Sequence, residues 1–230
     1  MKNRNLVFGI LLILAIFNSS VFSREKVRIG LYENPPKLYT DGKGNTEGFW
    51  YEITTEIASM EGWDAEWVYG SWDECLKKLE SNEIDIMPDT GVTPEREKTY
   101  LFSNETVYLS WTKIYCNKKY KIDTIIDLEG KKIAGLKNSF DLEGPDGLRK
   151  KLSDFNVKAD IIEMDNYKDI FKSVESGSSD AGIVDKDFGY LNQEMFDILP
   201  TSIILQPARM QYAFSRNSEK APGLIKKIDK

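Results

Sequence analysis

Residues 84–96, with the sequence IDIMPDTGVTPER, carry the pattern most able to bind a charged ligand. An apolar run leads into a polar loop and then into a helix start, where Thr93 suits the N-cap and Pro94 the first helical position. Arg96 closes the first turn. Because a guanidinium offers a planar fork of donors and keeps its charge, this arrangement predicts a carboxylate-binding site. The alternative is a surface arginine paired with a neighbouring glutamate, which would contribute little to stability.

The loop beside Arg96 consists of Asp89, Thr90 and Gly91. A carboxylate this close to a guanidinium could neutralise it, or could attract a cationic group of the ligand. We therefore include these three loop residues in the predicted site.

Four aromatic residues are candidates for stacking or cation–π contact with a ligand: Trp50, Trp67, Tyr69 and Trp72. Most aromatic residues in such places belong to the core. Tyr69 and Trp72 flank the loop that follows the second predicted strand, and their polar edges can meet a ligand. These two are predicted to line the site.

The composition argues against several classes of function. The chain contains no histidine, which removes the commonest general base and the commonest metal ligand, so neither a metal nor a cofactor is expected. Its 31 basic and 37 acidic residues give a net charge of −6, which becomes −8 without Lys2 and Arg4. This acidic balance argues against nucleic acid or an anionic membrane surface as a partner.

The first 23 residues have the pattern of a secretory signal peptide. Lys2 and Arg4 precede an apolar run at 6–17, which is short for a membrane span, and Val21 and Ser23 suit cleavage before the next residue. We predict export to the periplasm or another extracytoplasmic compartment. An uncleaved N-terminal anchor is the alternative.

Cys75 and Cys116 are the only cysteines. Export would permit a disulfide, but one cysteine falls on a predicted helix and the other at the end of a predicted strand. We favour two separate buried thiols, with a disulfide as the alternative.

Strands and helices alternate along the chain, which predicts an α/β fold with largely parallel sheets. Strands are predicted at 27–32, 65–69, 84–87, 106–115, 132–136, 159–163, 180–184, 203–205 and 210–215, and helices at 49–61, 71–80, 142–155, 166–177, 188–196 and 222–228. In the helix at 142–155, Gly144, Pro145 and Gly147 favour a true start nearer Asp146. The strand at 210–215 has no obvious partner in the second half of the chain. A two-lobed protein whose chain crosses between the lobes twice accounts for that strand.

Short landmarks follow one another in a familiar order: RIG at 28–30, PP at 35–36, GF at 48–49, EID at 83–85, TPER at 93–96, FS at 102–103, DLEGK at 127–131 and SDAGIVD at 179–185. With them the chain, from 27 to 228, resembles the extracytoplasmic solute-binding proteins of family 3, the type II periplasmic binding proteins typified by polar amino-acid receptors. The tight loop at 85–96 and residues 203–208 are more similar to the sensor versions found in histidine kinases.

The resemblance implies two lobes that are joined by a hinge and close on a ligand in the cleft. Lobe 1 would comprise residues 24–113 and 209–230, and lobe 2 residues 114–208. It also implies that Arg96 grips a ligand carboxylate and that Asp185 accepts hydrogen bonds from a ligand ammonium. For Asp185 the alternative is a helix N-cap.

Further site residues follow from the same resemblance. Leu136, Ser139 and Phe140 lie where the family uses a strand-to-helix loop that meets the carboxylate from the other side. Tyr32 and Asn34 match a loop that lines the cleft.

The leading functional hypothesis is a binding protein for a small, polar, carboxylate-bearing solute that is amino-acid-like. Its partner would be the permease of an ABC transporter or a membrane-bound kinase, because the chain stops early in its last helix and both transport and sensing stay open. The alternative is an enzyme similar to cyclohexadienyl dehydratases, with Asp89 or Glu33 as an acid of raised pKa.

Overall fold

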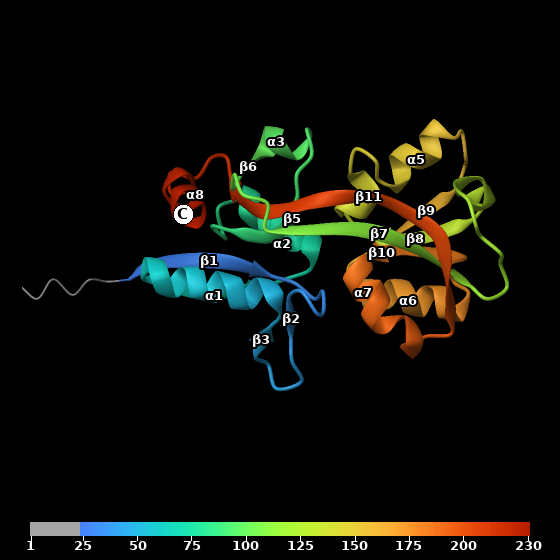
Figure 1. Cartoon of the computed structure of the whole chain (residues 1–230), viewed down its shortest axis with the longest axis horizontal. Helices are drawn as coiled ribbons and strands as arrows, with labels where there is room; N and C mark the ends of the chain where they lie inside the picture. Colours follow the sequence, from blue (N-terminus) through green and yellow to red (C-terminus); the bar gives the residue numbers. More distant parts are fainter. Residues whose placement is uncertain (1–23) are drawn as a thin grey trace, which may run out of the picture.

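Two groups of helices and strands, joined by two long strands, make up residues 24–230 of the computed structural model (Figure 1). The predicted signal peptide at 1–23 lies outside these described residues. Across the described part, no helix has the length and apolar character that a membrane crossing requires.

The first group, here called lobe 1, is built on two parallel strands. Its elements are β1 (Glu25–Leu31), β2 (Tyr39–Thr40), β3 (Thr46–Glu47), α1 (Phe49–Glu61), β4 (Trp63–Tyr69), α2 (Trp72–Glu80), β5 (Met87–Gly91), α3 (Arg96–Thr99), β6 (Tyr100–Phe102) and α8 (Ala221–Ile228). β1 pairs in parallel with β4, and an isolated bridge from Ile29 to Ile86 leads toward β5.

The second group, lobe 2, surrounds a short parallel sheet. Its elements are a 3₁₀ turn (Ile125–Leu128), β8 (Lys132–Leu136), α4 (Phe140–Glu143), α5 (Leu148–Asp154), β9 (Asp160–Met164), α6 (Tyr167–Ser176), β10 (Ala181–Asp185), α7 (Lys186–Asn192) and a second 3₁₀ turn (Gln193–Met195). β8 lies between β9 and β10 and is parallel to both.

The connection between the lobes consists of β7 (Tyr108–Asn117) and β11 (Ile198–Ser215), which run side by side in opposite directions along the length of the molecule (Figure 1). The strand order β5-β11-β7-β10-β8-β9, with β6 beside β11, makes one sheet that passes from lobe 1 into lobe 2. The predicted two-lobed fold with two crossings is therefore correct. We propose that lobe 1 comprises residues 24–113 and 209–230 and that lobe 2 comprises residues 114–208, as predicted.

Two predictions about single elements need correction. The strands expected at 203–205 and 210–215 form the single strand β11, whose register shifts between Pro200 and Ile204 and between Leu205 and Ala208. The helix expected at 142–155 is divided into α4 and α5, because Gly144 and Gly147 interrupt it and a Cβ on Gly147 would lie 2.7 Å from the Leu142 carbonyl oxygen.

The sheet around β7 also differs from the expected parallel arrangement, since β7 is antiparallel to both β10 and β11. The strand expected at 84–87 begins only at Met87, where pairing with β11 starts. Strand direction and pairing depend on the partner strand, which local sequence does not reveal.

The apolar core forms two clusters. The larger one includes Trp50 and Leu79 of lobe 1 and continues into lobe 2 with Phe171 and Val184, and the smaller one, in lobe 2, includes Ile133 and Leu142. Cys75 on α2 and Cys116 on β7 are both buried free thiols, as predicted.

Candidate functional site

A pocket lies between the two lobes, where the hinge strands pass. It is lined by residues near the C-terminal ends of β1, β5, β8 and β10, by α4, and by the middle parts of β7 and β11. Side chains fill most of it and leave a cavity of about 30 Å³. Both lobes therefore contribute to one small pocket.

Nine of the twelve predicted site residues line this pocket: Tyr32, Trp72, Asp89, Gly91, Arg96, Leu136, Ser139, Phe140 and Asp185. The other three lie elsewhere. Thr90 is buried and its hydroxyl donates to the carbonyl oxygens of Met87 and Pro88. Asn34 is buried behind the pocket wall, while Tyr69 is 59% exposed and lines a neighbouring groove.

Arg96 is positioned by its own loop. The Thr93 hydroxyl oxygen accepts the Arg96 backbone N–H at 3.0 Å, so Thr93 caps this turn as expected, although α3 begins only at Arg96. The guanidinium donates from Nη1 to the Gly91 carbonyl oxygen at 2.9 Å and from Nη2 to the Asn138 carbonyl oxygen at 2.7 Å. One carbonyl belongs to lobe 1 and the other to lobe 2, so Arg96 spans the interface.

The charge of Arg96 has no carboxylate partner. The residue is only 9% exposed, and among residues 24–230 no Asp or Glu oxygen lies within 4.0 Å of its nitrogens. Its carbon Cζ lies 5.6 Å from the centre of the Trp72 ring. Burial lowers the pKa of the guanidinium, but an arginine stays charged. The alternative of a surface arginine paired with a glutamate does not describe this residue.

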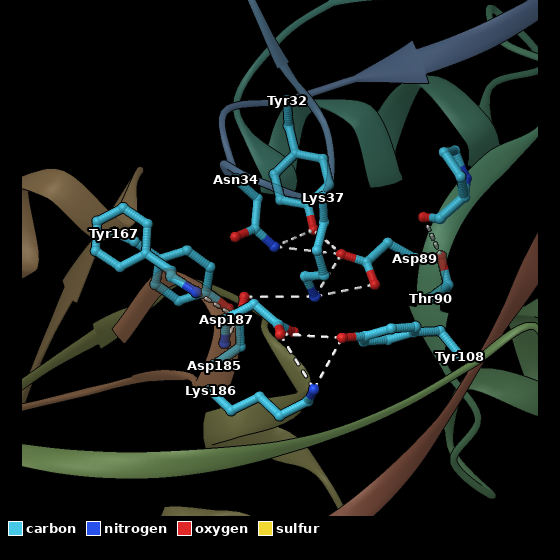
Figure 2. A network of polar contacts seen from close by, with 12 residues as sticks. Tyr32, Asn34, Lys37, Asp89, Thr90, Tyr108, Tyr167, Asp185, Lys186 and Asp187 are labelled. Carbon is cyan, nitrogen blue, oxygen red and sulfur yellow. Dashed lines mark hydrogen bonds and ion pairs between the residues drawn. The ribbon is translucent and has the colours of Figure 1, made fainter. Parts of the chain in front are cut away.

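Lys37 lies at the centre of a buried acidic cluster (Figure 2). Its Nζ is 2.8 Å from Asp89 Oδ2, 3.1 Å from Asp89 Oδ1 and 3.4 Å from Asp185 Oδ2. Asp89 also accepts from the Tyr32 hydroxyl at 2.6 Å and from Asn34 Nδ2 at 3.2 Å. One ammonium thus neutralises a carboxylate from each lobe.

These contacts fix the protonation of the cluster. Burial alone would lower the pKa of the Lys37 ammonium, but the charges of Asp185 and Asp89 outweigh it and raise that pKa. Burial raises the pKa of the Asp89 carboxyl, yet the direct contacts with Lys37 and Tyr32 keep the group a carboxylate. The pair is therefore ionic at neutral pH.

Asp185 is the helix N-cap that was weighed as the alternative for it, and its carboxylate also reaches the pocket. Its Oδ1 accepts the backbone N–H groups of Asp187 at 2.9 Å and Phe188 at 3.0 Å, so it is the N-cap of α7. Its Oδ2 is directed to Lys37 in the pocket and has no hydrogen bond of its own.

Asp141 is a third buried carboxyl in the pocket wall. It accepts a hydrogen bond from the Tyr167 hydroxyl at 2.7 Å. Burial raises the pKa of Asp141 to about 7, and the charge of Asp185 adds to the shift. At neutral pH this carboxyl is close to half protonated.

Two further features lie where the lobes meet. The Phe140 ring packs against Gly91 so closely that a Cβ on Gly91 would lie 2.4 Å from Phe140 Cδ2. Ser110, on β7, lines the pocket with a buried hydroxyl that has no hydrogen-bond partner.

The lobes also touch outside the pocket. The Asn138 carbonyl oxygen accepts from Trp72 Nε1 at 3.1 Å, and the Asn138 amide donates to the Asp73 carboxylate. Lys137 Nζ lies 3.2 Å from the same carboxylate. On the other side of the cleft, the Tyr108 hydroxyl donates to Asp187 at 2.9 Å (Figure 2).

Sequence reasoning missed eight pocket residues: Lys37, Ser110, Trp111, Thr112, Asp141, Tyr167, Ala208 and Met210. Only Asp141 had a local signal, because it lies next to the predicted residues Ser139 and Phe140. Within residues 24–230 no group of three or more His, Cys, Asp or Glu side chains is placed to hold a metal ion.

The model of the bacterial extracellular solute-binding proteins, family 3, matches residues 27–187. The chain belongs to this family. The L-cystine-binding protein TcyJ of Escherichia coli is 27% identical over 155 residues, which are 66% of this chain and 55% of that protein. The chain thus spans about half the length of the curated relatives that it matches first.

Solved structures share the fold. The holo arginine-binding protein of T. maritima superposes with a TM-score of 0.76 at 22% identity, covering 89% of this chain and 87% of that one. A histidine kinase sensor domain with similarity to periplasmic binding proteins gives 0.75 at 21% identity, covering 90% and 87%. The curated relatives are mainly amino-acid-binding proteins, with a membrane-bound lytic murein transglycosylase among them.

Proposed function

We propose that this family member binds a small carboxylate-bearing solute between its lobes outside the cytoplasm, and that Arg96 binds the carboxylate. One observation carries the proposal: a buried guanidinium lines a pocket between the lobes and has no carboxylate partner among residues 24–230. An unpaired charge in such a place is costly, and an anionic ligand would compensate it with charge-assisted hydrogen bonds.

Other features of the pocket support the same proposal. The unpartnered hydroxyl of Ser110 offers a polar contact to a ligand. The contacts of Arg96 with both lobes mean that a ligand held by Arg96 would also favour closure.

The downstream partner belongs to the same proposal. Similarity to a probable amino-acid ABC transporter-binding protein of Haemophilus influenzae supports an ABC-type permease, and similarity to a kinase sensor domain supports a membrane-bound kinase. In either role the closed form of the two lobes would be the state that the partner recognises.

Calorimetry with a panel of short carboxylic and amino acids tests the role of Arg96. Arg96→Met removes the guanidinium while keeping the length of the side chain. Loss of one partner of a buried charge pair costs about 2–5 kcal/mol, so affinity should fall at least about 30-fold. Arg149→Met is the matched control, because Arg149 makes its ion pairs with Glu143 and Glu163 at the exposed surface of lobe 2. Unchanged affinity in the Arg96 variant would refute the proposal.

An enzyme on this fold is the second candidate, and one observation favours it. The acids first considered do not suit general acid catalysis, because Asp89 is paired with Lys37 and Glu33 does not line the pocket. Asp141, with a pKa of about 7, has the property that a general acid needs. Incubation with prephenate-like cyclic acids, with Asp141→Asn as the control, tests this candidate by the appearance of product.

A further inference from the structure

Lys37 places an ammonium group inside the pocket that a ligand would enter. The residue follows the Pro35-Pro36 pair at the end of the β1 loop, and its side chain is 3% exposed. Its Nζ contacts both Asp89 on β5 and Asp185 at the end of β10 (Figure 2). The position between Asp89 and Asp185 is therefore occupied by an ammonium group of the protein itself.

The charges around the pocket show which ligand group is still needed. Two cations, Lys37 and Arg96, face three carboxyls, Asp89, Asp141 and Asp185. Lys37 is paired with two of these carboxyls, and the third is bound to the Tyr167 hydroxyl. Arg96 is the group left without a counter-charge. Within the described residues, Arg96 is thus the one cation of the pocket that has no carboxylate in contact with it, whereas the position between Asp89 and Asp185 already holds an ammonium.

We infer that the pocket selects small carboxylic acids without an ammonium group, because Lys37 already occupies the position between Asp89 and Asp185. This inference rests on the proposed role of Arg96. An incoming ammonium would have to displace a tethered one or lie beside it, and like charges at such distances repel strongly in a buried site. An oxo or hydroxyl group in its place carries no charge and can accept a hydrogen bond from the unpartnered Ser110 hydroxyl.

The specificity of the unmodified protein is the first test. Affinity is measured by calorimetry for pairs of acids with one carbon skeleton: pyruvate and alanine, 2-oxobutyrate and 2-aminobutyrate, 2-oxoglutarate and glutamate. The inference expects at least one oxo acid, or its hydroxy analogue, to bind at least 100-fold more tightly than its amino acid. An amino acid that binds as well as its partner acid would overturn the inference while leaving the proposed function intact. Failure of every acid in both sets would overturn both.

Chemical rescue is the second test. Lys37→Ala deletes the butylammonium side chain, and n-butylammonium chloride is the probe that replaces it. The probe should raise the melting temperature of this variant by several degrees more than it raises that of the parent protein, and amino acids should now bind more tightly than their oxo acids. Lys151→Ala is the matched control, since Lys151 pairs with Asp146 in lobe 2 away from the pocket.

The rescue experiment can also contradict the inference. A Lys37→Ala variant that gains no stability from the alkylammonium, or that keeps the parent preference for oxo acids, contradicts the inference. Far-UV circular dichroism shows whether the variant folds, and if it does not, the affinities of the unmodified protein decide alone.

Discussion

Five ionisable side chains share the pocket between the lobes, and each is controlled by its neighbours rather than by solvent. Lys37 is fixed by two carboxylates, whereas Asp141 faces the charge of Asp185 with only a neutral hydroxyl beside it. The first arrangement stabilises charge and the second opposes it. The same burial therefore gives a cation that stays charged and an acid that tends to keep its proton.

Asp141 should make stability depend on pH. Its folded-state pKa of about 7 lies above the ordinary 3.8, so between these values the folded protein holds a proton that the unfolded chain has released. Stability consequently falls as pH rises through this window and the loss is complete above it. In Asp141→Asn the amide stays neutral and still accepts the Tyr167 hydroxyl.

The free energy of unfolding of Asp141→Asn, relative to the parent, should rise by about 3 kcal/mol between pH 5 and pH 8. Urea unfolding followed by tryptophan fluorescence at both pH values measures this difference. An identical difference at the two pH values would mean that Asp141 is not the buried acid described here.

The sequence identified Arg96 but not Lys37, because Arg96 belongs to a local motif whereas the role of Lys37 depends on distant residues. The signal for Arg96 is local, since a cap, a proline and an arginine follow one another within four positions. A lysine after two prolines is typical of a surface turn, and lysines are buried only when paired. The partners of Lys37 lie 52 positions away at Asp89 and farther still at Asp185, so only the fold brings them together.

The elements that sequence predicted well are those that carry their own end signals. Helix α1 covers the expected residues and ends at Gly62 in a left-handed conformation, and α2 follows its N-cap Ser71, which forms a capping box with Glu74. β11 and the α4–α5 pair were predicted less well, because pairing with β7 and packing in lobe 2 decide where they start and stop. Met60 on α1 shows a limit of the helical pattern. Its spacing is that of an inward-facing apolar residue, yet Met60 is 76% exposed.

Helix α7 depends on a residue that also serves the pocket, and two variants separate these roles. Asp185→Ser loses the carboxylate but keeps an oxygen that can cap α7, whereas Asp185→Ala loses both. Because an N-cap contributes about 1 kcal/mol, the serine variant should be more stable than the alanine variant by that amount. Urea midpoints measure the difference. The same two changes at Asp165, an exposed residue, should differ by less than about 0.5 kcal/mol, and equal stability of the Asp185 pair would refute the capping role.

The two lobes meet along one interface beside the pocket. β7 and β11 connect the lobes covalently (Figure 1), and both polar contacts and the packing of Phe140 on Gly91 cross between them. Opening of the lobes would exchange these contacts for water, so we expect the closed and open arrangements to differ by a modest free energy. A ligand that adds contacts only in the closed form would shift this balance.

Asp73 should control that balance from outside the pocket. Its carboxylate, on α2 of lobe 1, meets Asn138 and Lys137 of lobe 2, and it does not line the pocket. Asp73→Ala removes contacts worth about 1–2 kcal/mol from the closed form alone. The apparent affinity for the acid that binds the parent protein should then fall by about 5- to 30-fold, because a smaller fraction of molecules is closed. Small-angle X-ray scattering should record a larger radius of gyration for the variant.

Asp64→Ala is the control. It changes an exposed carboxylate of β4 in the same lobe and should alter neither the affinity nor the radius of gyration. A weaker affinity at an unchanged radius would place the effect of Asp73 in the binding site itself and not in the closure of the two lobes.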